Sequence, residues 1–284
     1  GDSLSDVSRL DTMVTVVDAV NLTNDFASYD ALSDRGETTG EGDDRTLIAL
    51  LTDQIEFADV VILNKAADAG PEKVDAARKI IRSLNADAEI IETNHSAVPA
   101  DKILNTGLFD FEAAHEHPMW AKELYGFADH VPDTEEYGGA SFVYRARRPF
   151  IPERILEVLE GELPGVIRAK GHFWIATRPD WVAEFSLAGA LSSVKPIGTW
   201  WANVPQARWP EHVATSDYIK QHWAEPWGDR RQELVFIGAG IDWPSLKARL
   251  DACLVPEAMA AGPDALPLDL PDPFPGWRRV EDAA

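Results

Sequence analysis

The sequence predicts two folded regions: an α/β region with a parallel sheet, followed by an α+β region whose sheet is largely antiparallel. In the first hundred residues, short apolar segments rich in Val and Ile alternate with segments of helical periodicity, which is typical of a doubly wound sheet. After residue 139, strand-like segments follow one another with few helical segments among them. Residues 129–139 are rich in acids, Pro and Gly and predict a linker between the two regions.

Five elements are expected in the first region: a strand at 12–20, a helix at 45–58, a strand at 59–64, a helix at 70–85 and a strand at 88–93. The first strand is apolar nearly throughout, so we expect it to be buried on both faces. Asp43 or Asp44 is the expected N-cap of the first helix, and Pro71 fits the first turn of the second. Residues 23–44 have too little apolar content to pack and predict a polar loop.

The elements expected in the second region are a strand at 141–148, an amphipathic helix at 151–163, a hairpin at 166–177, strands at 197–204 and 230–240, and a closing helix at 243–254. The hairpin is expected to turn near Gly171. Cys253 lies on the apolar closing helix and is expected to be a buried core thiol. From Pro256 onward we expect an irregular Pro-rich tail on the surface. The predicted boundaries are 1–128, 129–139, 140–255 and 256–284.

The composition argues against several classes of function. The chain has 284 residues and a formal net charge of −22, which argues against a surface for nucleic acid or anionic membranes. Its one cysteine excludes an internal disulfide and a zinc site built mainly from thiolates. No apolar run approaches the roughly 20 residues of a membrane span, and we find no signal-peptide pattern. We therefore expect a cytoplasmic protein with no nucleic-acid and no membrane partner.

Asn64 and Lys65 follow the second expected strand, where ligands of α/β sheets bind. Guanine-nucleotide-binding proteins have an Asn-Lys-x-Asp loop at such a place, and its aspartate accepts hydrogen bonds from guanine N–H groups that adenine lacks. In this chain Ala67 occupies the fourth place and the acid is Asp68. The same residues also fit an ordinary polar turn between a strand and a helix, so the spacing alone leaves both interpretations open.

A second loop follows the third expected strand, and in it Ser96 and Ala97 would offer backbone N–H groups to a base. This loop matters only because it comes in the correct order after the Asn-Lys loop. A phosphate-binding segment of the form G-x-x-x-x-G-K-[ST] does not occur in the 284 residues. We therefore expect these residues alone not to hydrolyse GTP.

Five segments follow one another along the chain: TVVDAVN, LLTDQIEFADVVILNK, SFVYRARRPFIPER, RAKGHFWIATRP and GDRRQELVFIG. In this order they resemble the CobW-like GTPases, and more narrowly the branch of zinc-responsive metallochaperones that also contains nitrile hydratase activators. The resemblance extends from about Arg9 to about Leu254. It implies the distal half of a P-loop G domain followed by a complete CobW C-terminal domain. The N-terminal half, with its phosphate loop and Cys-x-Cys-Cys motif, would be absent from this chain.

The resemblance also implies a function. GTP with Mg²⁺ would be the cofactors, and the protein would deliver or allocate a metal, usually zinc, to a client metalloprotein. Two alternatives stay open: a shortened, non-catalytic relative that binds a partner protein or metal, and an activator of one metalloenzyme such as nitrile hydratase. Three parallel strands by themselves would leave an apolar sheet edge unpaired, which favours the missing strands or a homodimer as its cover.

Histidines and acids are the metal ligands that remain without the cysteine motif. His115 and His117 flank Glu116, and in an extended segment both rings would point to the same side. His130, next to Asp129, would complete a zinc shell if the linker folds back. The alternative is that these histidines are solvated residues of a loop.

Most of the ten tryptophans follow residue 143. Trp200 and Trp201 are adjacent, so in a strand one would face the core and the other a second surface. That surface would either be covered by the Pro-rich tail or bind a client, because exposed aromatic residues anchor interfaces.

Overall fold

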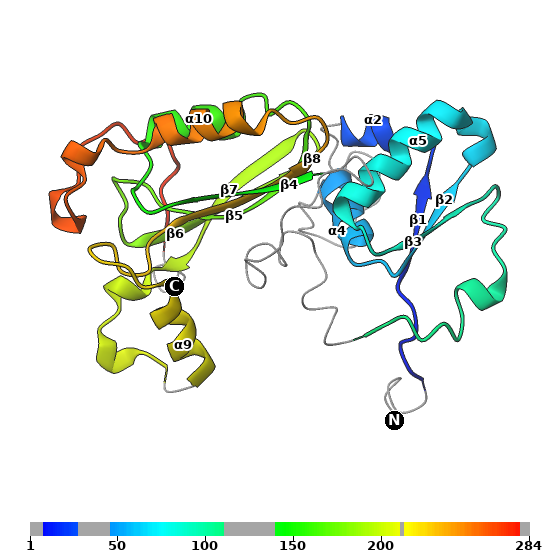
Figure 1. Ribbon diagram of the computed structural model, residues 1–284, viewed down its shortest axis with the longest axis horizontal. Helices are drawn as coiled ribbons and strands as arrows, with labels where there is room; N and C mark the ends of the chain where they lie inside the picture. Colours follow the sequence, from blue (N-terminus) through cyan, green and yellow to red (C-terminus); the bar gives the residue numbers. More distant parts are fainter. Residues whose placement is uncertain (1–7, 28–45, 111–139, 211–212, 279–284) are drawn as a thin grey trace.

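The computed structural model describes residues 8–27, 46–110, 140–210 and 213–278. A parallel sheet and an antiparallel sheet stand at opposite ends of the molecule, each with its own helices (Figure 1). The predicted order, an α/β region followed by an α+β region, is therefore confirmed. Within the described ranges, none of the helices combines the length and apolar character that a membrane crossing requires.

The first unit is a parallel sheet in the order β1-β2-β3 with helices packed on it. Its elements are β1 (Val14–Asp18), α2 (Leu22–Phe26), α4 (Leu47–Glu56), β2 (Val60–Asn64), α5 (Ala66–Leu84), β3 (Glu89–Glu92) and the 3-10 turn η1 (Ala100–Lys102). Val61 and Leu63 of the central strand are fully buried, and they share a core with Ile55 of α4 and Ile81 of α5. The burial of these branched side chains gives the sheet its main stabilisation.

The first strand is not buried on both faces, contrary to the expectation. Val14 and Val16 are 38% and 54% exposed, whereas Val17 is buried. In the described part of the chain, β1 is an edge strand whose one face packs on α4 and whose other face has no cover. A strand of this composition therefore alternates between buried and exposed residues here, despite its apolar sequence.

Two helix starts differ from the expectation. Thr46, and neither of the aspartates at 43 and 44, caps α4, because its Oγ1 accepts a hydrogen bond from the Ala49 N–H at 3.2 Å. The helical segment α5 begins at Ala66 and has a non-helical residue at Gly70, with φ 76°. Pro71 follows that kink, so it begins the second helical stretch as its sequence predicts.

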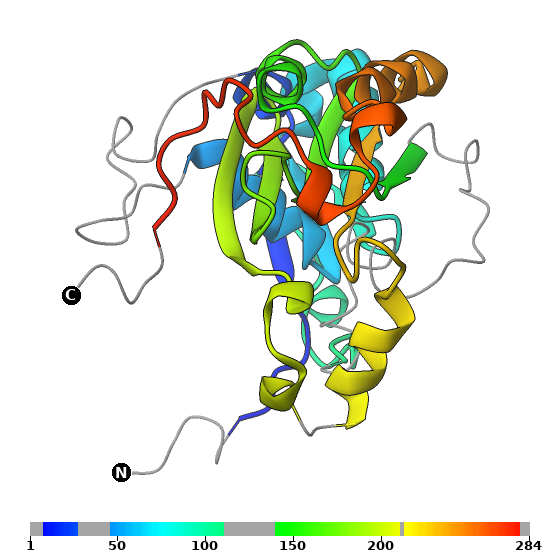
Figure 2. The same cartoon turned by 90° about the vertical axis from the view of Figure 1, so that its left-hand side faces the viewer.

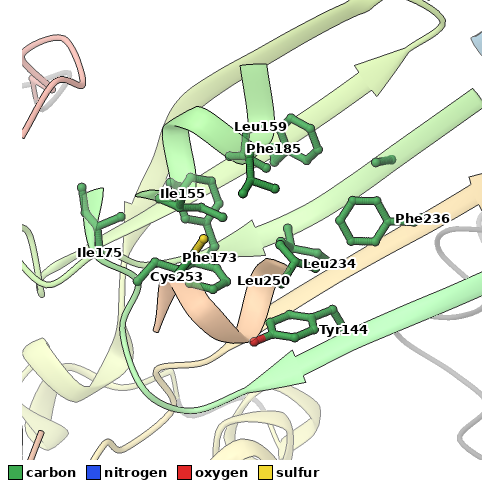
Figure 3. Packing of buried hydrophobic residues seen from close by; sticks show 14 of the residues in the cluster. Tyr144, Ile155, Leu159, Phe173, Ile175, Phe185, Leu234, Phe236, Leu250 and Cys253 are labelled. Carbon is green, nitrogen blue, oxygen red and sulfur yellow. The ribbon is translucent and has the colours of Figure 1, made fainter. Parts of the chain in front are cut away.

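The second unit is an antiparallel sheet of five strands in the order β4-β8-β5-β6-β7. Its strands are β4 (Ala140–Ala146), β5 (Val166–Phe173), β6 (Trp181–Ala188), β7 (Leu191–Thr199) and β8 (Gln232–Gly238), and its helices are α8 (Pro152–Glu160), α9 (Val213–His222) and α10 (Trp243–Cys253). Helices α8 and α10 lie on one face of the sheet (Figure 1). Figure 3 shows Phe173, Phe185 and Phe236 of the strands packed with Ile155 of α8 and Leu250 of α10.

The expected hairpin at Gly171 is wrong, because β5 continues straight through this residue. Gly171 has φ 148°, and a Cβ at this position would lie 2.1 Å from the Glu233 carbonyl oxygen of β8. The glycine therefore allows the backbones of β5 and β8 to approach closely, and it does not form a turn. His172, which the turn would have carried, is instead buried between Glu233 and Glu184 in the strand register.

The Pro-rich tail is irregular, as expected, but part of it is buried. It contains the 3-10 turns η4 (Glu257–Met259) and η5 (Pro263–Ala265). Leu266 packs with Trp200, and Phe274 lies in the core of the antiparallel unit. Arg178 fixes the tail by donating to Asp272 Oδ2 at 2.8 Å. The prediction of a buried Cys253 is confirmed, since 2% of this residue is exposed and burial raises the pKa of its thiol to about 11.

The two units are in direct contact. Arg168 of β5 donates from Nε to Glu56 Oε1 of α4 at 2.8 Å. Gly189, between β6 and β7, has φ 55°, and a Cβ at this position would lie 2.4 Å from the Phe26 carbonyl oxygen of α2. Both contacts join residues that are far apart in the sequence, and together they connect α2 and α4 of the first unit to the antiparallel sheet.

Candidate nucleotide-base site

Two loops meet at the carboxyl edge of the parallel sheet. Asn64 ends β2, and its Oδ1 accepts a hydrogen bond from the Ser96 N–H at 2.9 Å. In the reverse direction, Asn94 Oδ1 accepts from the Ala67 N–H at 2.9 Å. Because adjacent parallel strands present their carboxyl ends at the same edge, the two loops that the sequence singled out are neighbours and are tied by side-chain to backbone bonds.

Lys65 has a left-handed backbone, with φ 59° and ψ 31°, immediately before α5. Its ammonium group lies 2.7 Å from Asp18 Oδ2, and the side chain is 48% exposed. The hydrogen bond and charge of Asp18 raise the pKa of Lys65. For the carboxylate, partial burial acts against ionisation, but hydrogen bonds from Lys65 and the Val20 N–H lower its pKa. The stem of Lys65 is therefore held over the sheet edge as a charged group.

Asp68 lies in the first turn of α5 and is exposed. Its negative charge contributes, after the hydrogen bond and charge of Asp18, to the raised pKa of Lys65. The left-handed conformation of Lys65 turns the chain sharply before α5. Asp68 follows the motif's fourth place by one residue and lies in the first turn of that helix. Ala67, at the fourth place of the motif, has no group that could accept a hydrogen bond from a base.

The second loop contains two consecutive residues with left-handed backbones, His95 (φ 54°) and Ser96 (φ 53°). The Ser96 N–H is engaged by Asn64, and the Ala97 N–H donates to the Asn94 carbonyl oxygen at 3.2 Å. Both N–H groups that the sequence suggested for a base are thus used within the loops. Among the described residues, the N–H of His95 has no acceptor, and it is exposed at the same edge.

Asp18 is the residue of this site that the sequence reasoning did not identify. It ends β1, 47 positions before Lys65, and it accepts hydrogen bonds from Lys65 Nζ, the Val20 N–H and Asn21 Nδ2. The available signal was a lone carboxylate at the end of an apolar strand, TVVD, beside a second strand that ends in Asn-Lys.

The candidate zinc ligands His115, His117 and His130 lie outside the described residues. Within residues 8–27, 46–110, 140–210 and 213–278, no group of three His, Cys, Asp or Glu side chains is placed to hold a metal ion.

The geometry at this edge suits recognition of a planar base. An exposed lysine stem, a carboxylate in the following helical turn and a free backbone N–H in the facing loop belong to the two loops that meet at this edge. These groups offer a surface for a ring face, an acceptor for ring N–H groups and a donor for a carbonyl oxygen. They do not form a cradle for phosphates.

Two family models match the chain. The model described as the CobW/HypB/UreG nucleotide-binding domain matches residues 1–92, and the model described as the cobalamin synthesis protein cobW C-terminal domain matches residues 140–254. The first match contains the Asn-Lys loop, and the second coincides with the antiparallel unit.

Among curated proteins, the zinc-regulated GTPase metalloprotein activator 1 of Dictyostelium discoideum is 42% identical over 261 residues, which cover 90% of this chain and 54% of the relative. A zinc chaperone of Mycobacterium tuberculosis is 26% identical over 275 residues, which cover 95% of this chain and 62% of that protein. The chain thus spans about half to three fifths of the length of these relatives.

Among solved structures, the Zn(II)-bound YjiA GTPase from E. coli is 17% identical and aligns with a TM-score of 0.33, over 87% of this chain and 62% of that one. The Zn(II)-bound triple mutant of YjiA gives a TM-score of 0.34 at 16% identity.

Proposed function

Because the chain belongs to the CobW family, we propose that it acts in a GTP-dependent metallochaperone that delivers zinc to client metalloproteins. The observation that carries the proposal is the bond between Asn64 Oδ1 and the Ser96 N–H, which joins the two loops of the proposed base site at the carboxyl edge of the sheet. Two curated relatives whose names state zinc-linked functions support the choice of metal.

Each residue of the site has a proposed role. Asn64 fixes the two loops to one another, and Lys65, held by Asp18, covers one face of the guanine ring. Asp68 accepts hydrogen bonds from the guanine ring N–H and exocyclic amine, which adenine cannot supply. The loop of Ser96 and Ala97 faces the carbonyl edge of the base, with the His95 N–H as its open donor.

The residues fit the base end of GTP, but the 284 residues contain no G-x-x-x-x-G-K-[ST] segment to which the phosphates and Mg²⁺ could be assigned. When bound, Mg²⁺ would neutralise charge on the phosphates. For the zinc that is the cargo, we propose His115, His117 and His130 as ligands, since imidazoles suit this ion.

A role as partner-binding protein is the second candidate function, and the exposed apolar surface beside β1 favours it. Met13, Val14, Val16 and Phe57 are each at least 38% exposed around a cavity of about 520 Å³. Such a surface is expected to be covered by further strands of the same sheet, by a second copy of the protein or by a client protein. A general zinc chaperone and an activator of one metalloenzyme would both need such a client.

The proposed function predicts nucleotide-dependent transfer of zinc. The full-length protein, loaded with one equivalent of Zn²⁺, would be mixed with an apo zinc enzyme, and the recovery of that enzyme's activity would be followed with GTP, with GDP and without nucleotide. We expect GTP to accelerate recovery in the wild type but not in Asn64→Ala, with Asn105→Ala as a control on a neighbouring loop. Equal recovery under all three conditions would contradict a GTP-dependent chaperone.

A further inference from the structure

A second candidate site lies in the antiparallel unit, at the end remote from the parallel sheet. There α9 stands beside two 3-10 turns, η2 (Trp201–Asn203) and η3 (Gln206–Arg208), as both ribbon views show (Figures 1 and 2). Between them is a pocket of about 700 Å³ whose lining includes Trp201, Val204, Pro205, Trp209, Lys220 and Trp223. This volume is in the range of pockets that bind small molecules or peptide side chains.

The walls of the pocket are fixed by buried polar groups. The Asp229 carboxylate, in a residue that is 4% exposed, accepts the N–H groups of Trp201 and Ala202 at 3.0 and 2.9 Å. Arg230, 5% exposed, donates to the Asn203 side chain and to the Pro179 carbonyl oxygen. Because these charged groups are buried and satisfied, the turns that carry the tryptophans are held in place without a ligand.

Among the three tryptophans in the described lining of the pocket, the indole N–H of one has no acceptor. Trp200 donates to the Trp181 carbonyl oxygen at 2.8 Å, Trp209 to that of Val204 at 3.0 Å, and Trp223 to the Glu225 carboxylate at 2.9 Å. The indole N–H of Trp201, by contrast, donates to no atom of the described residues, and the residue is only partly buried. The pocket therefore offers indole faces and one free donor.

The charges select among possible ligands. In the part of the chain that the structure describes, the lining contains one cation, Lys220, and no carboxylate, although the chain as a whole has a net charge of −22. Lys220 has only a loose, exposed pair with Asp217 at 3.6 Å, and such pairs are weak. A ligand with an acidic group beside its apolar part would therefore be favoured.

We propose that this pocket binds a proline-containing peptide of a partner protein in the polyproline II conformation, with an acidic residue next to the prolines. Proline rings would lie on the indole faces, a peptide carbonyl oxygen would accept from Trp201 Nε1, and the acidic side chain would meet Lys220. Aromatic grooves with open donors recognise such peptides because the polyproline II chain loses little entropy and its carbonyl groups are free.

The protein's own Pro-rich tail is not the ligand within the same chain. Its residues are already bound elsewhere: Leu266 in the cluster with Trp174 and Trp200, and Asp272 and the Phe274 carbonyl oxygen by the guanidinium of Arg178. The proposal concerns a partner's peptide, and it does not depend on nucleotide binding or on zinc transfer.

The test uses the full-length protein and a fluorescein-labelled peptide, PPLPPDPPLP, in an anisotropy titration. A second peptide with every proline replaced by alanine is the ligand control. We expect saturable binding of the first peptide only. Trp201→Phe, which keeps a ring but removes the donor, should weaken binding about fivefold, the value of one hydrogen bond of about 1 kcal/mol. Lys220→Gln should weaken it by a similar factor.

Two matched controls test the assignment: Trp243→Phe, a half-buried tryptophan of α10, and Lys195→Gln, an exposed lysine of β7. Neither should change the affinity. No binding of the proline peptide, equal binding of the alanine peptide, or full affinity in both Trp201→Phe and Lys220→Gln would overturn the proposal. A dimer in sedimentation that Trp223→Ala abolishes would assign the pocket to a second copy of this chain and would also overturn it.

Discussion

The guanidinium of Arg168 and the carboxylate of Glu56 form an ion pair between the two sheets, with 2.8 Å between Arg168 Nε and Glu56 Oε1. Their side chains are 4% and 1% exposed, so the pair is shielded from water. Arg168 also reaches Asp53 Oδ1 at 3.4 Å on the same helix. The pair fixes the end of α4, the helix that leads directly into β2 and its Asn-Lys loop, to the antiparallel sheet.

Breaking this pair on one side is expected to cost about 3–5 kcal/mol of unfolding free energy, because the remaining charge is buried without its partner. Arg168→Met and Glu56→Leu should each show this loss in urea unfolding, and the double variant should lose less than the sum. The pair of Lys195 and Glu184, in which the lysine is exposed and the glutamate half-buried, is the control, and Lys195→Met should cost less than about 1 kcal/mol. A cost below about 1 kcal/mol for Arg168→Met would mean that the two units do not depend on this contact.

Replacing Asp18 by Asn is expected to weaken binding of GDP about fivefold, because Lys65 loses the charged partner that holds its stem at the sheet edge. The protein's stability should change little, since both groups are partly exposed. Calorimetric titration with GDP measures the effect. Asp75→Asn, which breaks an exposed pair on α5, is the matched control and should leave the affinity unchanged. Equal affinities of Asp18→Asn and the wild type for GDP would mean that Asp18 does not contribute to nucleotide binding.

Gly171→Ala is expected to destabilise the protein by about 2 kcal/mol or more, because a Cβ would meet the Glu233 backbone in the centre of the sheet. Gly198→Ala in β7 is the control, since a Cβ there has no neighbour within 4 Å. Thermal unfolding of the two variants should therefore differ by several degrees. Similar melting temperatures would show that β5 and β8 are not in close contact at Gly171.

The stability of the protein is expected to fall on acidification through the titration of His172. Burial, and then the positive charge of Arg231, lower the pKa of His172 to about 4, and its Nε2 has no hydrogen-bond partner, although Glu233 Oε2 is 3.5 Å away. Because the unfolded chain takes up this proton near pH 6.5, stability is complete above that pH and is lost as the pH falls towards 4.

Between pH 7.5 and pH 5, this one histidine should cost about 2 kcal/mol. Urea unfolding at both values should show a smaller difference in His172→Gln than in the wild type. His95→Gln, which changes an exposed histidine, should keep the full pH dependence. An unchanged dependence in His172→Gln would mean that this ring is protonated and paired with Glu233 in the folded protein.

Elements whose signals lie in neighbouring residues could be predicted from the sequence, whereas contacts between residues far apart in the sequence could not. The segments that became β2 and α10 were predicted because apolar pattern and capping residues are local signals. Strand β6 (Trp181–Ala188) was missed, although Phe185 and Leu187 alternate with polar residues in the period of a half-buried strand.

In the candidate site, the order of the two loops was predicted, but their bonds were not. Asp18 was missed since its partner Lys65 is 47 positions away in sequence. The pair of Arg168 and Glu56 joins residues 112 positions apart, and no local pattern indicates it. The histidine ligands remain a prediction, because they lie outside the described residues.

Recognition of guanine by the loops around Asn64 and Ser96 would be measured by the ratio of GDP and ADP affinities. Both nucleotides would compete with a fluorescent GDP analogue on the full-length wild type and on Asp68→Asn. We predict that GDP binds at least about tenfold more tightly than ADP, and that Asp68→Asn loses this preference, since a hydrogen bond to a charged group is worth about 1.5–3 kcal/mol. Equal affinities of GDP and ADP for the wild type would mean that these loops do not recognise guanine.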